Sequence, residues 1–188
     1  MTIEPLEGFD FVRPHANIRL DGATAVDLDI ADADEALDRL LDQAAVACAF
    51  EQIGGAEACL WMARDYALQR SAFGRPIASY QALKHKLADL YVLVELARSN
   101  AFFAAWAMDH DASALPAAAA TARLAATEAY ETAARESLQT HGGIGFTWDA
   151  DCHFHYRRAR LLSVALGTPV FWSERLFGAL QKTRRRSA

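Results

Sequence analysis

One short turn region carries most of the residue types in this chain that could bind an anionic ligand. Arg70 and Arg75 flank Phe73 there, between two segments whose apolar residues recur at helical spacing. Gly74 suits the end of the first helix, where a positive φ is needed, and Pro76 lacks the N–H that a continuing helix requires. Two guanidinium groups, a ring and the free N-terminus of the next helix would together suit an anionic ligand. The alternative is an ordinary turn between helices with solvated arginines.

Other combinations of reactive side chains give weaker signals. His153 and His155 are two residues apart, so on a helix they point to different faces, unlike the i,i+4 pairs that bind zinc. A polar helix surface is favoured there, and we predict no metal site. Ser137, Ser163 and Cys152 have no Ser-His-Asp or Cys-His signature around them, so nucleophilic catalysis has no support.

The totals indicate an ordinary globular protein. The 188 residues are 53% hydrophobic and 23% charged with a net charge of −5, which suits one domain with a large core. The acidic excess argues against a nucleic-acid partner. No apolar run reaches the ~20 residues of a membrane span, and residues 1–10 lack a signal-peptide pattern. Cys48, Cys59 and Cys152 form no CxxC pair, which indicates a reducing, cytoplasmic setting.

The apolar spacing predicts an all-α fold, an up-and-down bundle of four to five helices with a short N-terminal β segment. The expected helices cover residues 32–70, 79–109, 116–140, 149–166 and 168–182. Gly54 and Gly55 lie in the middle of the first helix, where each glycine costs about 1 kcal/mol relative to alanine. We interpret this pair as a close approach to a neighbouring helix rather than to a ligand.

The first residues of the chain have a different pattern. Residues 16–20 alternate apolar and polar and precede an Asp-Gly turn, which predicts a short strand with an unpaired edge. That edge must pair with a partner, pack on the helices or be mobile. We therefore divide the chain into an extended segment (1–28), a helical bundle domain (29–183) and a basic tail (184–188).

Three ordered motifs resemble those of the acyl-CoA dehydrogenases. Residues 70–89 are similar to the helix–turn–helix signature of that family, residues 139–148 to a second motif, and Gly167-Thr168 to the start of its last helix. The resemblance covers roughly residues 8–180 and implies the C-terminal helical domain of a bacterial branch of the family. It implies that the N-terminal helical domain and most of the β-barrel domain are absent, with residues 1–28 as a remnant of the barrel.

The resemblance also implies an activity, a cofactor and partners. The activity is that of an FAD-dependent oxidoreductase of lipid metabolism, which carries out α,β-dehydrogenation of an acyl-CoA thioester. The partners are a second copy or another acyl-CoA dehydrogenase subunit, and electron-transfer flavoprotein or a similar acceptor. FAD contacts across the subunit interface are assigned by the resemblance to Arg70, Phe73, Gln81, Gln139, Gly142, Gly143 and Thr168. Spacing alone would make Gln139 and the two glycines a plain helix C-cap.

The general base is missing from the usual family position. That position, just before Gly167, is Leu166, and the position used by other branches falls near Ala44. Neither side chain can accept a proton. Glu51, two turns after Ala44, becomes the candidate catalytic base if it is buried among apolar neighbours; the alternative is an exposed or lysine-paired glutamate. We therefore expect either an enzyme component that is not active alone or a non-catalytic helical assembly module.

Overall fold

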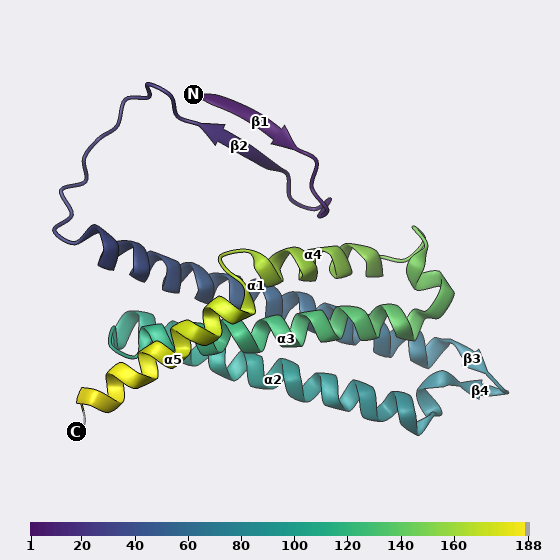
Figure 1. Cartoon of the computed structure of the whole chain (residues 1–188). Helices are drawn as coiled ribbons and strands as arrows, with labels where there is room; N and C mark the ends of the chain where they lie inside the picture. The colour runs from purple at the N-terminus through teal and green to yellow at the C-terminus, as the bar shows by residue number, and fades with distance from the viewer. Residues whose placement is uncertain (187–188) are drawn as a thin grey trace.

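A computed structural model describes residues 1–186 and shows five α-helices with a two-stranded hairpin beside them (Figure 1). The helices are α1 (Ala33–Gln69), α2 (Gln81–His110), α3 (Leu115–His141), α4 (Cys152–Val164) and α5 (Pro169–Arg186). The strands are β1 (Thr2–Leu6), β2 (His15–Arg19), β3 (Ser71–Ala72) and β4 (Arg75–Pro76), and two 3-10 helices are η1 (Ile77–Ser79) and η2 (Gly142–Phe146). The predicted all-α fold is confirmed.

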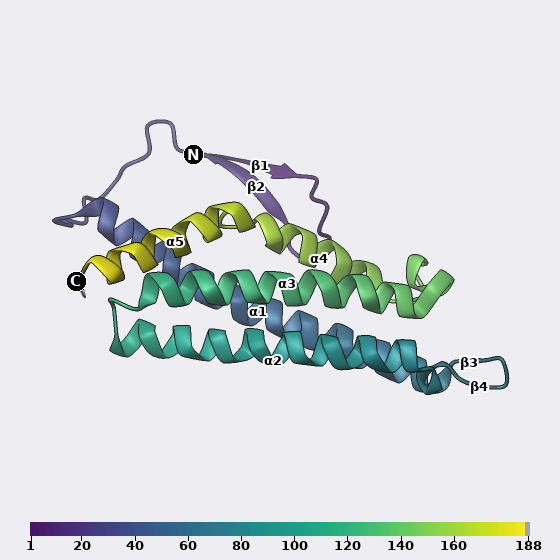
Figure 2. The same ribbon diagram turned by 60° about the horizontal axis from the view of Figure 1, so that its bottom comes forward.

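Helix α3 lies at the centre of the bundle and contacts each of the other four helices (Figure 2). Its sides are lined with alanine, and small side chains let the axes of packed helices come close together. Alanine also has the highest intrinsic helix propensity, so the sequence of α3 favours both the helix and its close packing. The alanines of α3 that are at most 5% exposed are Ala118, Ala119, Ala120, Ala122, Ala126, Ala129, Ala133 and Ala134.

The glycine pair of α1 marks one of these close approaches. A Cβ on Gly55 would overlap the ring of Tyr130, which extends from α3 and is 2% exposed. Gly54, on the other face of α1, would meet no atom within 4 Å. Our interpretation of the pair as helix packing is therefore confirmed for Gly55, while Gly54 lies open to solvent.

Most helix ends lie near their predicted positions. Asp32 Oδ1 accepts a hydrogen bond from the backbone N–H of Glu35 (2.9 Å) at the start of α1, and α3 ends where Gly142 takes a φ of 62°. Helix α4 begins at Cys152, three residues later than predicted, because η2 and a turn occupy the preceding stretch. Helix α5 continues to Arg186, so part of the predicted tail is helical; residues 187–188 lie outside the described residues.

The predicted N-terminal strand is present as β2, and its partner comes from the same chain. Strand β1 pairs with β2 in an antiparallel register that places Ile3 opposite Ile18 and Glu4 opposite Asn17. The sequence analysis did not predict β1. Both strands are almost entirely exposed, and Figure 1 shows the hairpin set apart from the helices, whereas in Figure 2 its loop end overlaps α4.

The glycine pair supplies a matched test of the packing between α1 and α3. Gly55→Ala should lower the free energy of unfolding by about 1–3 kcal/mol, because the new methyl group collides with the Tyr130 ring. Gly54→Ala should raise it by up to about 1 kcal/mol, because the alanine gains helix propensity in open space. Urea unfolding followed by circular dichroism measures both changes. Equal effects of the two substitutions would contradict this packing.

Candidate functional site

The turn between α1 and α2 is a small β-hairpin. Strands β3 and β4 are antiparallel and are joined by a two-residue turn of Phe73 and Gly74, whose φ angles are 52° and 79°. Two successive positive φ angles are typical of the tight turns whose twist matches that of antiparallel strands. Helix α1 has already ended at Gln69, with Arg70 as its C-cap. The prediction that Gly74 ends the first helix is therefore wrong, because its positive φ serves the hairpin turn.

The hairpin is held so that one ring points into solvent. Tyr80 Oη donates a hydrogen bond to the carbonyl oxygen of Ala72 (2.9 Å), and the Arg75 guanidinium lies 4.2 Å from the centre of the Tyr80 ring. Phe73 at the tip is 97% exposed. Gln81 begins α2 directly after Tyr80 and is also exposed. Our sequence analysis gave Tyr80 no separate role, so it missed this support of the turn.

The second motif reaches the same end of the bundle. The rings of Tyr66 on α1 and His141 on α3 stack with their centres 4.3 Å apart, which places the end of α3 beside the hairpin (Figure 1). Gln139 lies exposed in the last turn of α3, and Gly142 and Gly143 follow His141. Six of the seven predicted cofactor residues therefore belong to one end of the molecule.

This end of the bundle has the chemistry that a phosphate-bearing nucleotide needs. A Cβ on Gly142 or Gly143 would meet no atom within 4 Å, so their backbone is open to an approaching molecule. Arg70 is exposed, and no carboxylate within residues 1–186 forms an ion pair with it. An unpaired guanidinium, an exposed ring and accessible backbone fit the pyrophosphate and adenine ends of FAD.

The seventh residue, Thr168, lies at the corner between α4 and α5. Leu166 and Gly167 turn the chain there with φ angles of 60° and 107°. The hydroxyl oxygen of Thr168 then accepts a hydrogen bond from the backbone N–H of Phe171 (3.3 Å), which confirms the predicted N-cap. Leu166 occupies the usual base position and is 43% exposed.

This corner is far from the hairpin. Arg123 of α3 donates to the carbonyl oxygen of Ala165 (2.7 Å) and also to the side chain of Gln52 on α1. The part of α1 from Gln52 to its end at Gln69 is about 25 Å long, at 1.5 Å per residue. The predicted cofactor residues therefore form two separate groups, the hairpin end and the α4–α5 corner.

The candidate base Glu51 is engaged in ion pairs. Its Oε1 accepts from Arg158 Nε on α4 (3.1 Å) and lies 3.3 Å from Arg13 Nη2, and its side chain is 37% exposed. The condition that Glu51 is buried among apolar neighbours is thus not met. These contacts favour the alternative of an exposed, ion-paired glutamate, although the pairing cations are arginines of the N-terminal segment and α4 rather than a lysine of α2.

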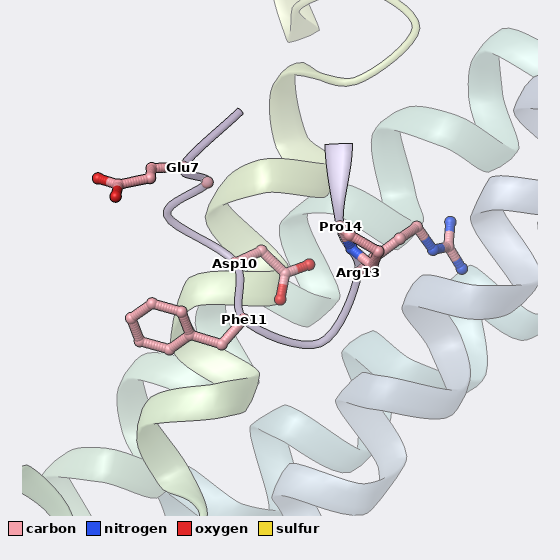
Figure 3. Close-up of a pocket in the computed structure, with 6 residues that line it drawn as sticks. Glu7, Asp10, Phe11, Arg13 and Pro14 are labelled. Atoms are coloured by element: carbon pink, nitrogen blue, oxygen red, sulfur yellow. The ribbon is translucent and has the colours of Figure 1, made fainter. Parts of the chain in front are cut away.

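Arg158 also holds the loop between β1 and β2. Its Nη1 lies 2.5 Å from Oδ2 of Asp10, and the Asp10 side chain is fully buried. The loop encloses a shallow hollow of about 440 Å³ lined by Glu7, Gly8, Asp10, Phe11, Arg13 and Pro14 (Figure 3). Figure 3 shows Phe11 directed away from Arg13, with Asp10 between them. This anchor has no sequence signal, because its two charges are far apart along the chain.

Residues 1–186 contain neither a metal-binding cluster nor a helix suited to cross a membrane. Within residues 1–186, no group of His, Cys, Asp and Glu side chains could hold a metal ion. His155 Nδ1 lies 3.1 Å from Tyr130 Oη, and His153 Nδ1 lies 2.8 Å from the carbonyl oxygen of Ala150. None of the helices in this part of the chain is both long and apolar enough to cross a membrane.

Comparison with known proteins defines the class of the chain. Residues 35–169 match the family described as acyl-CoA dehydrogenase, C-terminal domain. The chain therefore belongs to the acyl-CoA dehydrogenase family, as the three motifs implied. It is 48% identical over 130 residues to the acyl-CoA dehydrogenase IpdE2 of Mycobacterium tuberculosis, a match that covers 69% of this chain and 39% of the relative.

Two solved structures extend the likeness to nearly the whole chain. The Tcur3481–Tcur3483 steroid ACAD matches with a TM-score of 0.85 at 27% identity, over 98% of this chain and 49% of that one. The ChsE4–ChsE5 complex from Mycobacterium tuberculosis matches with a TM-score of 0.76 at 26% identity, over 96% and 49%. The chain thus spans about two fifths of the curated relative and about half of each structure.

The conformation of Phe73 predicts a gain in stability when the ring is removed. Phe73→Asn should raise the free energy of unfolding by about 0.5–1 kcal/mol, because asparagine adopts a positive φ more readily and almost no buried area is lost. Phe177→Asn is the control, since Phe177 is 64% exposed on a regular helix, and this substitution should lower stability slightly. Urea unfolding measures both. A loss of stability in Phe73→Asn would contradict a strained turn.

The Asp10 anchor predicts a local effect on the N-terminal segment. Asp10→Asn should weaken docking of the loop by about 2 kcal/mol, because one charge-assisted hydrogen bond to a buried arginine is lost. Limited proteolysis should then cut residues 7–14 faster while the helices stay resistant. Arg13→Ala, which removes a 58% exposed partner of Glu51, should change stability by at most about 0.5 kcal/mol. Equal cleavage of both variants would count against the anchor.

Proposed function

We propose that this chain is the cofactor-binding helical part of an FAD-dependent acyl-CoA dehydrogenase, which works in the cytoplasm within a larger assembly. The observation that carries the proposal is Phe73, a ring with a positive φ that is 97% exposed. Such a conformation costs on the order of 1–3 kcal/mol. No contact within residues 1–186 offsets this cost with buried area, so the ring is presented for a ligand or partner.

The hairpin end of the bundle would hold the nucleotide portion of FAD. Arg70 would pair with the pyrophosphate, Phe73 and Gln81 would contact the adenine side, and the open backbone of Gly142 and Gly143 would let the adenosine approach closely. Bound FAD would supply the acceptor for the β-hydride of an acyl-CoA thioester. The residues of this chain orient the cofactor and supply no redox chemistry of their own.

The assembly would bring together groups that lie far apart in one chain. Thr168 lies near Gln52, about 25 Å of helix from the hairpin, so the two groups would contact different parts of a flavin or different flavins. A second copy or another acyl-CoA dehydrogenase subunit would complete each site. The names Tcur3481–Tcur3483 and ChsE4–ChsE5 each denote two components, which supports an assembly of unlike subunits. An electron-transfer flavoprotein or a similar carrier would accept the electrons.

The general base would come from the partner subunit. Leu166 cannot accept a proton, and Glu51 remains the candidate on this chain only if its ion pairs with Arg158 and Arg13 open. The lack of a free base on this chain also favours a second function, a non-catalytic helical module that serves assembly alone. The two functions differ in whether the hairpin end binds FAD.

The visible spectrum of the purified protein, with and without added FAD, separates the two functions. An enzyme component should show a bound flavin band in a dimer or larger assembly, with mass measured by light scattering. Arg70→Ala should weaken FAD binding by roughly tenfold or more, because a hydrogen bond between charged groups is lost. Phe73→Asn should also weaken binding, although it stabilises the fold.

Two control variants keep this test specific. Arg39→Ala removes an exposed arginine near the other end of α1, and Phe177→Asn removes an exposed ring from α5. Both should bind FAD like the unchanged protein. A colourless protein that ignores FAD in every oligomeric form, even with its partner subunit present, would reject the enzyme component and leave the assembly module.

A further inference from the structure

Arg123 is a charged residue inside the core, and it pairs with no carboxylate within the described residues 1–186. It lies on the central helix α3, is 1% exposed, and donates to four neutral oxygens. Burial lowers the pKa of its guanidinium. A buried charge is costly unless other groups replace the water around it. The hydrogen-bond partners of Arg123 must therefore offset the cost of removing its guanidinium from water.

Two of its partners are main-chain oxygens at the end of α4. Arg123 Nη2 donates to the carbonyl oxygens of Leu162 and Ala165, the latter at 2.7 Å. The last carbonyls of a helix have no partner within the helix and carry the negative end of its dipole, so a cation there is favoured. Arg123 thus caps the C-terminus of α4 from inside the bundle.

The other two partners fix the guanidinium itself. Arg123 Nη1 donates to the side-chain oxygen of Gln52 on α1 and to the hydroxyl oxygen of Thr127 (2.6 Å) one turn along α3. Gln52 also donates from its amide nitrogen to Thr127 (3.2 Å), so these three side chains form a closed network. The cap on α4 is consequently tied to both α1 and α3.

The chain bends immediately after the capped carbonyl, and α5 leads away from the end of α4 (Figures 1 and 2). Leu166 and Gly167 follow Ala165 with positive φ angles, and Thr168 begins the next helix. We propose that Arg123 is a positioning residue: it holds the α4–α5 corner in one geometry and thereby places Thr168 and position 166 for the flavin site. This role rests on the proposed function, in which Thr168 contacts FAD.

Hydrogen exchange on the full chain tests the positioning role without any cofactor. The amides of Ala165, Gly167 and Trp172 donate to oxygens within this corner, at 3.0, 3.3 and 3.1 Å. In Arg123→Met these amides should exchange roughly tenfold faster or more, because the cap is gone while the side chain keeps a similar length. Amides in the middle of α2 should keep their exchange rates.

Two further variants separate positioning from general stability. Arg123→Lys keeps the charge at the end of α4 and should restore a large part of the protection at the corner. Thr127→Val removes one partner of Arg123 but leaves both of its bonds to α4, so it should lower the unfolding midpoint while the corner amides lose much less protection than in Arg123→Met. Uniformly faster exchange in all helices of Arg123→Met and Arg123→Lys, or an unchanged corner in both, would overturn the proposal.

FAD titration provides the second readout. If the unchanged protein binds FAD, Arg123→Met should weaken binding by roughly tenfold or more and Arg123→Lys by less, because Thr168 is displaced in the first and held in the second. Equal binding by all three proteins would overturn the link to the flavin site. If the unchanged protein binds no FAD, the proposed function fails, while the exchange data still decide whether Arg123 fixes the corner.

Discussion

The alanine sides of α3 are the constraint on which the rest of the bundle depends. Four other helices contact α3, and they can come close to it because most of its buried positions are alanines. Tyr130 buries a large ring on α3, and the residue of α1 that packs against it is Gly55. The large ring on α3 fits only where α1 has no side chain, and this fit fixes the register of α1 along α3.

Buried charges then orient the shorter elements. Asp42 of α1 is 2% exposed and binds Arg175 of α5 through both carboxylate oxygens, at 2.7 and 2.9 Å. Arg123 caps α4, and Arg158 of α4 anchors the loop at Asp10. Each pair joins a short helix or loop to a longer element at one defined point. Hydrogen-bonded charges are directional, so they specify position where a small apolar contact would allow sliding.

The sequence predicted those features that are local. Helix extents, the Thr168 cap and the end of α3 at Gly142 all follow from residues within one turn of each other. The hairpin between β3 and β4 was missed because each strand has two residues, too few for any periodicity. Arg123 stands in a run of alanines, where an arginine is typical of an exposed helix face, and only the packed bundle shows that it is buried.

The anchor at Asp10 makes part of the N-terminal segment contribute buried contacts to the helical domain. The family match starts at residue 35, whereas Asp10 is buried against α4 and lies outside that region. A shortened protein that begins at α1 would leave Arg158, whose side chain is 9% exposed, with Glu51 as its remaining carboxylate partner. The region that the family match covers and the part of the structure that is held together by buried contacts therefore have different boundaries, and the N-terminal loop belongs to the second.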